Sequence, residues 1–514
     1  MILSNKDDLT LASLTFLAII FAISWYKSTK DRSRFPPGPI GLPVLGYIPF
    51  LGPNLHHEFT KLAQRYGSIF KLNLGSKTVI VVSSSDLAKV VLREQDDIFA
   101  NRDPPVAGLV ITYGGQNILW SDNNLYWRNL RKLLVHEVLN NKNLQDFSSL
   151  RRSEVRKTLK YVYENIGKEV DISRVGFLTS MNVVINMMWG KSLVEDEKIN
   201  KSDVEFQEVI SKIVELLGTA NLSDFFPGLS RLDLQGVKRQ MKQQLKTMDN
   251  IFETMFQDRI KLNNNASKAK EQEGKKDFLQ ILLELKDQDN TTSFKDTQVK
   301  ALLMDIFTGG TDTTSTMVGW TMAELMQNQD VMKIVQNELK EVVGLHNIVE
   351  ESHLSELHHL EAVIKETFRL HPPLPLLISR SPNQSCMVGG YSIPKGSNVY
   401  LNIWSIHRDP HYWDEPLKFN HNRFLNLDGV TKFDYNGTNC NFLPFGSGKR
   451  MCPGVRLGEK MLMYILASLL HSFDWTLPDG NKLDLSDKFG IVMKKKEPLV
   501  VIPSKRLAQE DLYM

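Results

Sequence analysis

The sequence predicts a mainly α-helical protein with small β-sheets, built as one large globular body behind an apolar N-terminal segment. Three observations support this prediction. The chain has 514 residues, of which 42% are hydrophobic and 24% charged, so it can bury a large core. Apolar residues recur at helical spacing in most segments of the second half. Alternation of apolar and polar residues is limited to positions 66–83, around Gly75 and Ser76, as in a half-buried hairpin.

Charge and cysteine content exclude several classes of protein. The chain has 62 Lys and Arg against 59 Asp and Glu, a net charge of +3, which is too balanced for wholesale nucleic-acid binding. Its three cysteines, Cys386, Cys440 and Cys452, form no paired framework and no CxxC. We therefore expect a reducing compartment, with Cys386 and Cys440 as small buried hydrophobes.

The N-terminal segment predicts a membrane anchor. Residues 9–26 carry no charge, and as a helix they would be about 27 Å long, close to the thickness of a bilayer core. Basic residues follow at 27–34, so the positive-inside rule places residues 1–8 in the lumen and the body, 51–514, in the cytosol. The alternative is a cleaved signal peptide, but the segment lacks an A-x-A-like site and a basic start.

A basic and proline-rich hinge is expected at 27–50, between this anchor and the body. Four prolines between Pro36 and Pro43 fix φ and remove amide donors, which prevents a continuous helix. An ordinary linker would have the same composition.

Helical spacing of apolar residues in the body predicts five helices, and a polar run separates the first helix from the other four. The expected helices cover residues 122–139, 277–285, 296–327, 330–343 and 355–370. Residues 261–276 are rich in Lys, Asn and Glu, which is typical of a solvated loop.

The strongest motif is FGSGKRMCPG at 445–454, which fits the pattern F-x-x-G-x-R-x-C-x-G. It resembles the haem-binding loop of cytochrome P450 monooxygenases. The resemblance implies that Cys452 binds haem iron as a thiolate and favours O–O cleavage. Glycines permit a tight backbone beside a flat macrocycle, and Arg450 can pair with a haem propionate. A buried structural cysteine is the alternative for Cys452.

The segment expected as a helix at 296–327 has poor helix formers in its middle, TGGTDTT at 308–314. Consecutive glycines would allow a flat cofactor to approach, and hydroxyls can bond back to carbonyls and open the helical ladder. The stretch resembles the family motif [AG]-G-x-[DE]-T-[TS], which implies that Asp312 and Thr313 relay protons, Thr313 being the main candidate. Alone, these residues would more often form a turn.

Glu366 and Arg369, at i and i+3, project from one face of a helix that ends before two prolines. Most such pairs are solvated and contribute little. Here they resemble the family's E-x-x-R signature, with Arg423 as its third member, which implies a buried structural triad. The chain departs from the commoner P-E-R-F by having His421 and Asn422, so the contacts of that proline and glutamate are not expected.

Further arginines are candidates for the haem propionates. Trp127 and Arg131 resemble the family's W-x-x-x-R, a spacing of one helical turn that can bring an indole N–H and a guanidinium to one propionate. By the same resemblance, Arg102 and Arg380 are additional propionate ligands. Arg450 and Arg131 carry the prediction.

The motifs occur in the family's order along nearly the whole chain. The resemblance implies the cytochrome P450 fold, a single large haem domain with an N-terminal transmembrane anchor in the endoplasmic reticulum. It also implies haem b with an axial thiolate and electrons from NADPH through a membrane-bound flavoprotein reductase, since the chain shows no persuasive dinucleotide motif of its own.

The sequence is similar to plant microsomal members, notably cadinene-type sesquiterpene hydroxylases and flavonoid hydroxylases. The substrate-lining segments implied by the resemblance are apolar: 106–119, 306–307, 374–378 and 491–492. We therefore expect hydroxylation of a small lipophilic plant metabolite, first a terpenoid and second a flavonoid. A haem-thiolate isomerase or aldoxime dehydratase is a rival, as is a membrane-tethered haem or lipid binder without activity.

Overall fold

Helices dominate the computed structural model, which describes residues 34–190, 201–266, 277–288, 295–478 and 483–514, together with Thr15 and Ile19. The helices of nine or more residues are α2 (Leu55–Tyr66), α5 (Leu125–Leu133), α7 (Ser148–Glu164), α8 (Ile172–Trp189), α9 (Lys201–Gly218), α11 (Val237–Ala266), α12 (Phe278–Gln288), α13 (Asp296–Gln327), α14 (Gln329–Val342), α15 (His358–Leu370) and α17 (Val455–Ser472). Shorter ones are α3 (Ser85–Lys89), α4 (Val106–Ile111), α6 (Asn141–Asp146), α10 (Leu222–Phe225) and α16 (Ile403–Ile406).

The described strands form four small sheets, so the prediction of a mainly α fold with limited sheet is confirmed. One sheet has the order β1-β2-β6 and another β3-β10-β7, while β4 pairs with β5 and β8 with β9. The strands are β1 (Ile69–Leu74), β2 (Lys77–Val82), β3 (Val170–Asp171), β4 (Cys386–Val388), β5 (Tyr391–Ile393), β6 (Asn398–Leu401), β7 (Phe473–Thr476), β8 (Asp487–Lys488), β9 (Lys494–Lys495) and β10 (Val500–Lys505).

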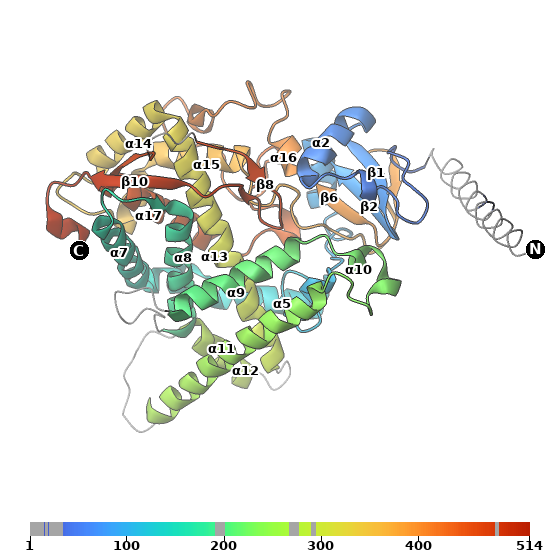
Figure 1. Cartoon of the computed structure of the whole chain (residues 1–514), viewed down its shortest axis with the longest axis horizontal. Coiled ribbons are helices and arrows are strands. Elements are labelled where there is room, and N and C mark those ends of the chain that lie inside the picture. Colours follow the sequence, from blue (N-terminus) through green and yellow to red (C-terminus); the bar gives the residue numbers. More distant parts are fainter. Residues whose placement is uncertain are drawn as a thin grey trace, which may run out of the picture.

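The expected hairpin is the pair β1 and β2, which turns at Gly75, where φ is +58°. Residues of this hairpin alternate between core and surface along β1. β2 then pairs in parallel with β6, matching Val79 with Asn398, which joins two segments far apart in the sequence. In Figure 1 this sheet and α2 lie at one end of the molecule, and α7, α14 and α17 lie at the other.

The long helix α13 passes through the core and packs against α8, α15 and α17. Glycines let α8 and α13 approach each other closely. A Cβ added at Gly176 would lie 3.2 Å from Val318 Cβ, and one added at Gly319 would lie 2.8 Å from Ser173 Oγ. Since most of α13 beyond residue 310 is buried, its polar residues there are held by the surrounding helices rather than by water.

The five predicted helices correspond to α5, α12, α13, α14 and α15, and for α13 the predicted bounds are those of the structure. Two expectations were wrong. The polar run at 261–276 is not a loop throughout, because α11 continues through Asn263, Asn264 and Asn265 to Ala266. Once a long helix is formed, adding a residue of weak propensity costs less than starting a helix. The middle of α13 does not open, since its helical hydrogen bonding is continuous.

The expected anchor at 9–26 and its lumenal flank at 1–8 lie outside the described residues, apart from Thr15 and Ile19. Within the described parts of the chain, no helix is both long and apolar enough to cross a bilayer. The described part of the expected hinge, 34–50, lies along β1. Lys71 N donates to Pro37 O at 2.8 Å, and Tyr47 N donates to Asn73 O at 2.7 Å.

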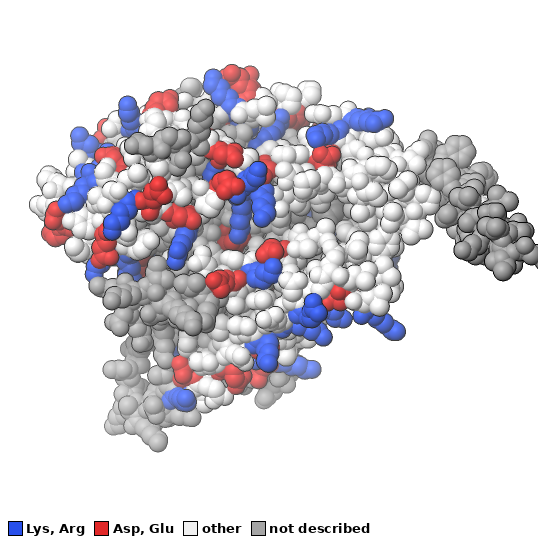
Figure 2. Space-filling model, viewed as in Figure 1, with Lys and Arg blue, Asp and Glu red and all other residues white. Residues whose placement is uncertain are grey.

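The balanced charge of the sequence extends to the surface. Figure 2 shows Lys and Arg interspersed with Asp and Glu on the face seen in Figure 1. Neither sign dominates this face, so long-range attraction of a polyanion gains little there.

Candidate functional site

The cysteine loop is a tight turn between the 3-10 turn at Gly448–Arg450 and helix α17. Gly446 and Gly448 have φ of +71° and +67°, a region that favours glycine. A Cβ at Gly448 would lie 2.4 Å from Leu92 O, so the backbone also needs glycine for space. Cys452 N donates to Phe445 O at 3.0 Å, which closes the loop and places the thiol ahead of α17.

The Cys452 thiol faces an internal space. The side chain of Cys452 is accessible to water. Burial among protein atoms nevertheless raises the pKa of its thiol, and the Gly454 N–H and the Arg131 guanidinium oppose that rise. Exposure and desolvation together indicate a thiol that lines a recess rather than the outer surface. A thiolate there has an N–H donor and a cation within its surroundings, which favour the charged form needed for metal binding.

The centre of α13 also borders open space. Gly309 is exposed although it lies in the middle of a core helix, and a Cβ added there would meet nothing within 4 Å. Threonine hydroxyls bond back to the preceding turn, as the sequence predicted, without breaking the helix. Thr313 Oγ1 donates to Gly309 O at 2.7 Å, and Thr308 Oγ1 donates to Met304 O at 2.7 Å.

Asp312 is buried, with 1% of its surface exposed, and it has an ion-pair partner that sequence reasoning missed. Lys494 Nζ, on β9, donates to Asp312 Oδ1 at 2.5 Å. Asp312 Oδ2 is buried with no hydrogen-bond partner among the described residues. Asp312 and Thr313 are adjacent in sequence, so one stretch of α13 offers a carboxylate and a hydroxyl to any proton transfer beside it.

Arg450 and Trp127 lie against each other next to the cysteine loop. The guanidinium carbon is 4.2 Å from the centre of the Trp127 ring, and Arg450 donates to Ala100 O at 2.6 Å and to Ile118 O at 2.9 Å. Trp127 Nε1 donates to the same Ile118 carbonyl at 2.9 Å. Burial, followed by the charges of Arg380 and Arg131, lowers the pKa of Arg450 to about 9.

The other three candidate arginines also lie in the interior and donate to backbone carbonyls. Arg131 Nη2 donates to Met451 O at 2.6 Å, beside the cysteine, and Arg102 Nη1 donates to Ile378 O and Ser379 O at 2.5 and 2.8 Å. Arg380 pairs with Asp96 at 2.7 Å and donates to Ser447 O at 2.7 Å. Asp96 therefore holds one of the arginines that the sequence assigned to a propionate.

The arrangement fits a haem group with two propionates. Burial is the main cause that lowers the pKa of the Arg102 guanidinium, and the charges of the nearby Arg450, Arg380 and Arg131 lower it further. Arg102 Nε is buried without a partner among the described residues. Arg380 is buried and the other three arginines are partly buried. They outnumber the carboxylates of Asp96, Asp122 and Asp305 that interact with them, which leaves an excess of positive charge that carboxylates of a ligand can balance. The thiol of Cys452 would supply the axial ligand.

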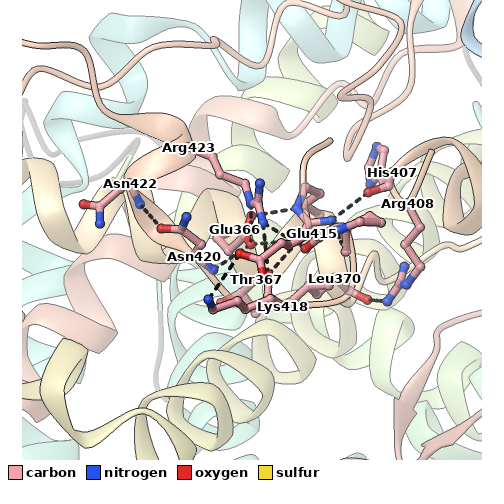
Figure 3. A network of polar contacts seen from close by, with 12 residues as sticks. Glu366, Thr367, Leu370, His407, Arg408, Glu415, Lys418, Asn420, Asn422 and Arg423 are labelled. Carbon is pink, nitrogen blue, oxygen red and sulfur yellow. Dashed lines mark hydrogen bonds and ion pairs between the residues drawn. The ribbon is translucent and has the colours of Figure 1, made fainter. Parts of the chain in front are cut away.

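The predicted charged triad forms, and Figure 3 shows its network of polar contacts. Glu366 and Arg369 are fully buried and make two hydrogen bonds of 2.7 Å each. Arg423 Nε donates to Glu366 Oε1 at 3.4 Å, and Asn420 N donates to the same oxygen at 2.9 Å. Arg369 also donates to the carbonyls of His407 and Pro416 at 2.9 and 2.7 Å.

The residues that replace the family's proline and glutamate have different surroundings. His421 is buried, its Nε2 lies 3.3 Å from His359 Nδ1, and burial lowers its pKa to about 4. Asn422 is exposed, and its N–H donates to Asn420 Oδ1 at 3.2 Å. The arginine that follows keeps its contact with Glu366 despite these two changes.

Aromatic side chains cover α13 near the open segment. Phe307 is 1% exposed and packs against Phe206 of α9 and Phe252 of α11, with ring centres 5.4 and 6.0 Å apart. Leu377, in the predicted apolar segment 374–378, has φ of +49° and lies next to Gly446. The sequence included Phe307 among the lining residues but gave no sign of the two phenylalanines that enclose it.

Comparison with known proteins identifies the fold and its relatives. The cytochrome P450 family model matches residues 36–502. A flavonoid 3′-monooxygenase of Crocosmia x crocosmiiflora is 36% identical over 510 residues, covering 98% of each chain. The geraniol 8-hydroxylase of Catharanthus roseus is also 36% identical, over 95% of this chain and 98% of its own. A zebra fish cytochrome P450 solved with progesterone superposes with a TM-score of 0.74 at 27% identity, over 88% of this chain and all of that chain.

Proposed function

The chain belongs to the cytochrome P450 family and is a monooxygenase of the plant type, and we propose that it hydroxylates a small lipophilic plant metabolite, most readily a terpenoid of sesquiterpenoid size. The observation that carries the proposal is the composition of the segments next to the thiol and α13. Phe307 and its two phenylalanine neighbours, residues 374–378 and residues 491–492 present apolar side chains and no charge. Such a lining favours an uncharged apolar substrate over a phosphorylated or sugar-like one.

The family uses a haem thiolate and electrons that a reductase supplies from NADPH. We assign the axial ligand to Cys452 and the propionate contacts to Arg102, Arg131, Arg380 and Arg450. The expectation that the Trp127 indole N–H also binds a propionate is corrected by the structure, because this single donor is used by Ile118 O; Trp127 packs against Arg450 instead. The bound haem supplies reductive activation of dioxygen and insertion of one oxygen atom into a C–H bond. Burial raises the pKa of the Cys452 thiol, and the Gly454 N–H and Arg131 oppose that rise.

Two side chains of α13 are proposed to handle the protons that this reaction consumes. The Thr313 hydroxyl, which donates to Gly309 O, borders the open segment of the helix. Asp312, one residue before it, is paired with Lys494, whose side chain is 42% exposed and reaches solvent. In this proposal a proton passes from solvent through this pair to the Thr313 hydroxyl, which bonds to Gly309 where the intact helix borders open space.

The triad of Glu366, Arg369 and Arg423 is assigned a structural role. It ties α15 to the segment 407–423 through three backbone carbonyls and one amide. Residues 9–26 are proposed to anchor the chain in the endoplasmic reticulum, with the catalytic body in the cytosol beside the membrane-bound reductase.

A flavonoid is the second candidate substrate, because a flavonoid 3′-monooxygenase is as similar to this chain as a terpenoid hydroxylase is. The test is turnover of a panel of sesquiterpene hydrocarbons, geraniol and flavones by the full chain coupled to a plant reductase. We expect a product heavier by one oxygen atom that requires both NADPH and dioxygen. Conversion without NADPH would indicate an isomerase or dehydratase instead, and a chain that turns over flavones alone would reverse the order of the two candidates.

A further inference from the structure

A buried carboxylate on α13, outside the sequence motifs, binds the loop at residues 112–124. Asp305 lies seven residues before Asp312. Its Oδ1 accepts from Asn117 Nδ2 at 2.6 Å, and its Oδ2 accepts from Ile118 N at 2.7 Å. The Leu119 N–H is a further donor to this carboxyl. Three donors from consecutive residues therefore meet one side chain of the helix.

Ile118, whose N–H donates to Asp305, also binds two residues next to the cysteine loop. The Ile118 carbonyl accepts from both Trp127 Nε1 and Arg450 Nη1, at 2.9 Å each. The N–H of Ile118 therefore donates to α13, and its carbonyl accepts from the two residues next to the cysteine loop. A shift of Ile118 would change the position of the loop and the hydrogen bonds of Arg450 and Trp127 together.

The loop is connected by hydrogen bonds of its own as well as by those to its neighbours. Asn117 Oδ1 accepts from Trp120 N at 3.1 Å, and Ser121 Oγ donates to Gly115 O at 2.5 Å. At its start, Tyr113 OH donates to Asp249 of α11 at 2.6 Å. A loop that is rigid within itself moves as a unit about its attachments. Asp305 makes the shortest hydrogen bonds between this loop and α13, and Thr297 Oγ1 adds a longer one to Gln116 Oε1 at 3.4 Å.

We propose that Asp305 is a positioning residue for substrate selection: it fixes the 112–124 loop against α13 and thereby sets the shape of the substrate space between that loop and the exposed stretch of α13 at Gly309. The part of this inference that concerns substrate rests on the proposed function. Asp305 lies two residues before Phe307, so the same helical turn carries the loop attachment and a proposed lining residue. The role is indirect, since Asp305 acts through the backbone of Ile118 and Leu119.

The hydrogen-bond pattern allows a sharp test by exchange of the two side chains. Asp305→Asn replaces one acceptor oxygen by an NH₂ group that faces donors, and Asn117→Asp places a second carboxylate against Asp305. In the double variant the amide at 305 can accept from Ile118 N and donate to the carboxylate at 117, which can still accept from Trp120 N. Each single change breaks the pairing, and the double change restores it.

The measurement is amide hydrogen exchange of the full-length haem protein, which requires no substrate. We expect faster exchange in peptides covering residues 112–124 for each single variant, and exchange close to that of the unchanged protein for the double variant. Peptides of α14 should be the same in all four proteins. Equal loop exchange in Asp305→Asn and the unchanged protein would overturn the proposal, as would a double variant that exchanges as fast as the singles.

A second readout separates positioning from general stability. Binding of 4-phenylimidazole, followed by the shift of the haem absorption band, should weaken about threefold or more in Asp305→Asn and recover in the double variant. Unchanged binding in the single variant would contradict the role in shaping the substrate space. Should Asp305→Asn yield no haem protein, Asn117→Ala removes one donor and carries the same two measurements. Failure of the substrate panel would refute the proposed function while leaving the exchange result intact.

Discussion

Lys494 and Asp312 form an ion pair of 2.5 Å between residues 182 positions apart in the sequence, at the segment of α13 where Gly309 faces open space. The carboxylate is almost fully buried, whereas the lysine side chain is 42% exposed. One end of the pair therefore contacts solvent and the other end lies beside Thr313. This pair gives the acid of the α13 motif a connection to bulk water that the motif alone does not reveal.

Lys494→Met should lower the yield of product per NADPH several-fold, because Asp312 loses its ion-pair partner and its connection to solvent. The lost electrons should appear as hydrogen peroxide. Lys496→Met is the matched control, since Lys496 is exposed on the same hairpin. Product, NADPH and peroxide are measured together in the reconstituted system. Equal yields in the two variants would remove Lys494 from the proton route.

Thr313→Ala should retain haem but divert electrons to peroxide, since the hydroxyl that donates to Gly309 O is the proposed final proton donor. A loss of one to two orders of magnitude in coupled turnover is expected from the usual size of such contributions, about 10²-fold. Thr308→Ala is the control, because Thr308 makes the same back-bond one turn earlier. Tight coupling in Thr313→Ala would contradict the assignment.

Cys452→Ser should abolish the long-wavelength Soret band of the reduced carbon monoxide complex, because that band reports sulfur ligation of the iron. Cys440→Ser serves as the control, as Cys440 is buried in a separate apolar cluster. The spectra of both variants, each expressed as the full chain with haem supplied, decide the assignment. A normal band in Cys452→Ser would place the axial ligand elsewhere.

Glu366→Gln should destabilise the protein by about 3–5 kcal/mol, because it leaves the fully buried Arg369 without a counter-charge. Glu415→Gln, which affects the exposed pair with Lys418, should cost at most about 1 kcal/mol. The midpoints of urea-induced loss of tryptophan fluorescence compare the two. Similar midpoints would show that the triad contributes little to stability.

The pH dependence of stability should carry a contribution from Asp305. Burial raises its pKa to about 7 from 3.8, against hydrogen bonds from Asn117 and residues 118–119, with Arg450 and Tyr126 as the charged and titratable groups nearby. The folded chain thus binds this proton more tightly than the unfolded chain. Its stabilising effect is complete below about pH 4 and is lost as the pH rises through about 7.

The unfolding free energy of the unchanged protein, relative to that of Asp305→Asn, should therefore fall between about pH 4 and about pH 7. Urea midpoints of the two proteins across this range test the sign. A difference that stays constant or grows with pH would show that the carboxyl is ionised throughout.

The parts of the site that local sequence determines were predicted well. The bounds of α13 follow from apolar spacing over nine turns, which is too long to be ambiguous. Glu366 and Arg369 meet because residues at i and i+3 share a helical face. The glycines of the cysteine loop are required by left-handed φ and by close packing, so their pattern can be recognised without any tertiary information.

The remaining contacts depend on how distant segments pack, and no local pattern specifies them. Lys494 is one of three consecutive lysines, and nothing in that run indicates which one reaches α13. Asp96, which follows α3, pairs with Arg380. Asp305 binds Asn117, which lies 188 positions before it in the sequence. Such partners are determined by the tertiary fold, since side chains with the same spacing elsewhere are simply solvated.

The parallel pairing of β2 with β6 has a consequence for how the chain is made. Val79 can pair with Asn398 only after another 319 residues have been synthesised. At about 5–20 residues per second, a ribosome needs roughly 16–64 s to add that length. During this interval the nascent strand Lys77–Val82 carries an unpaired apolar edge, which makes it a natural binding site for chaperones during synthesis.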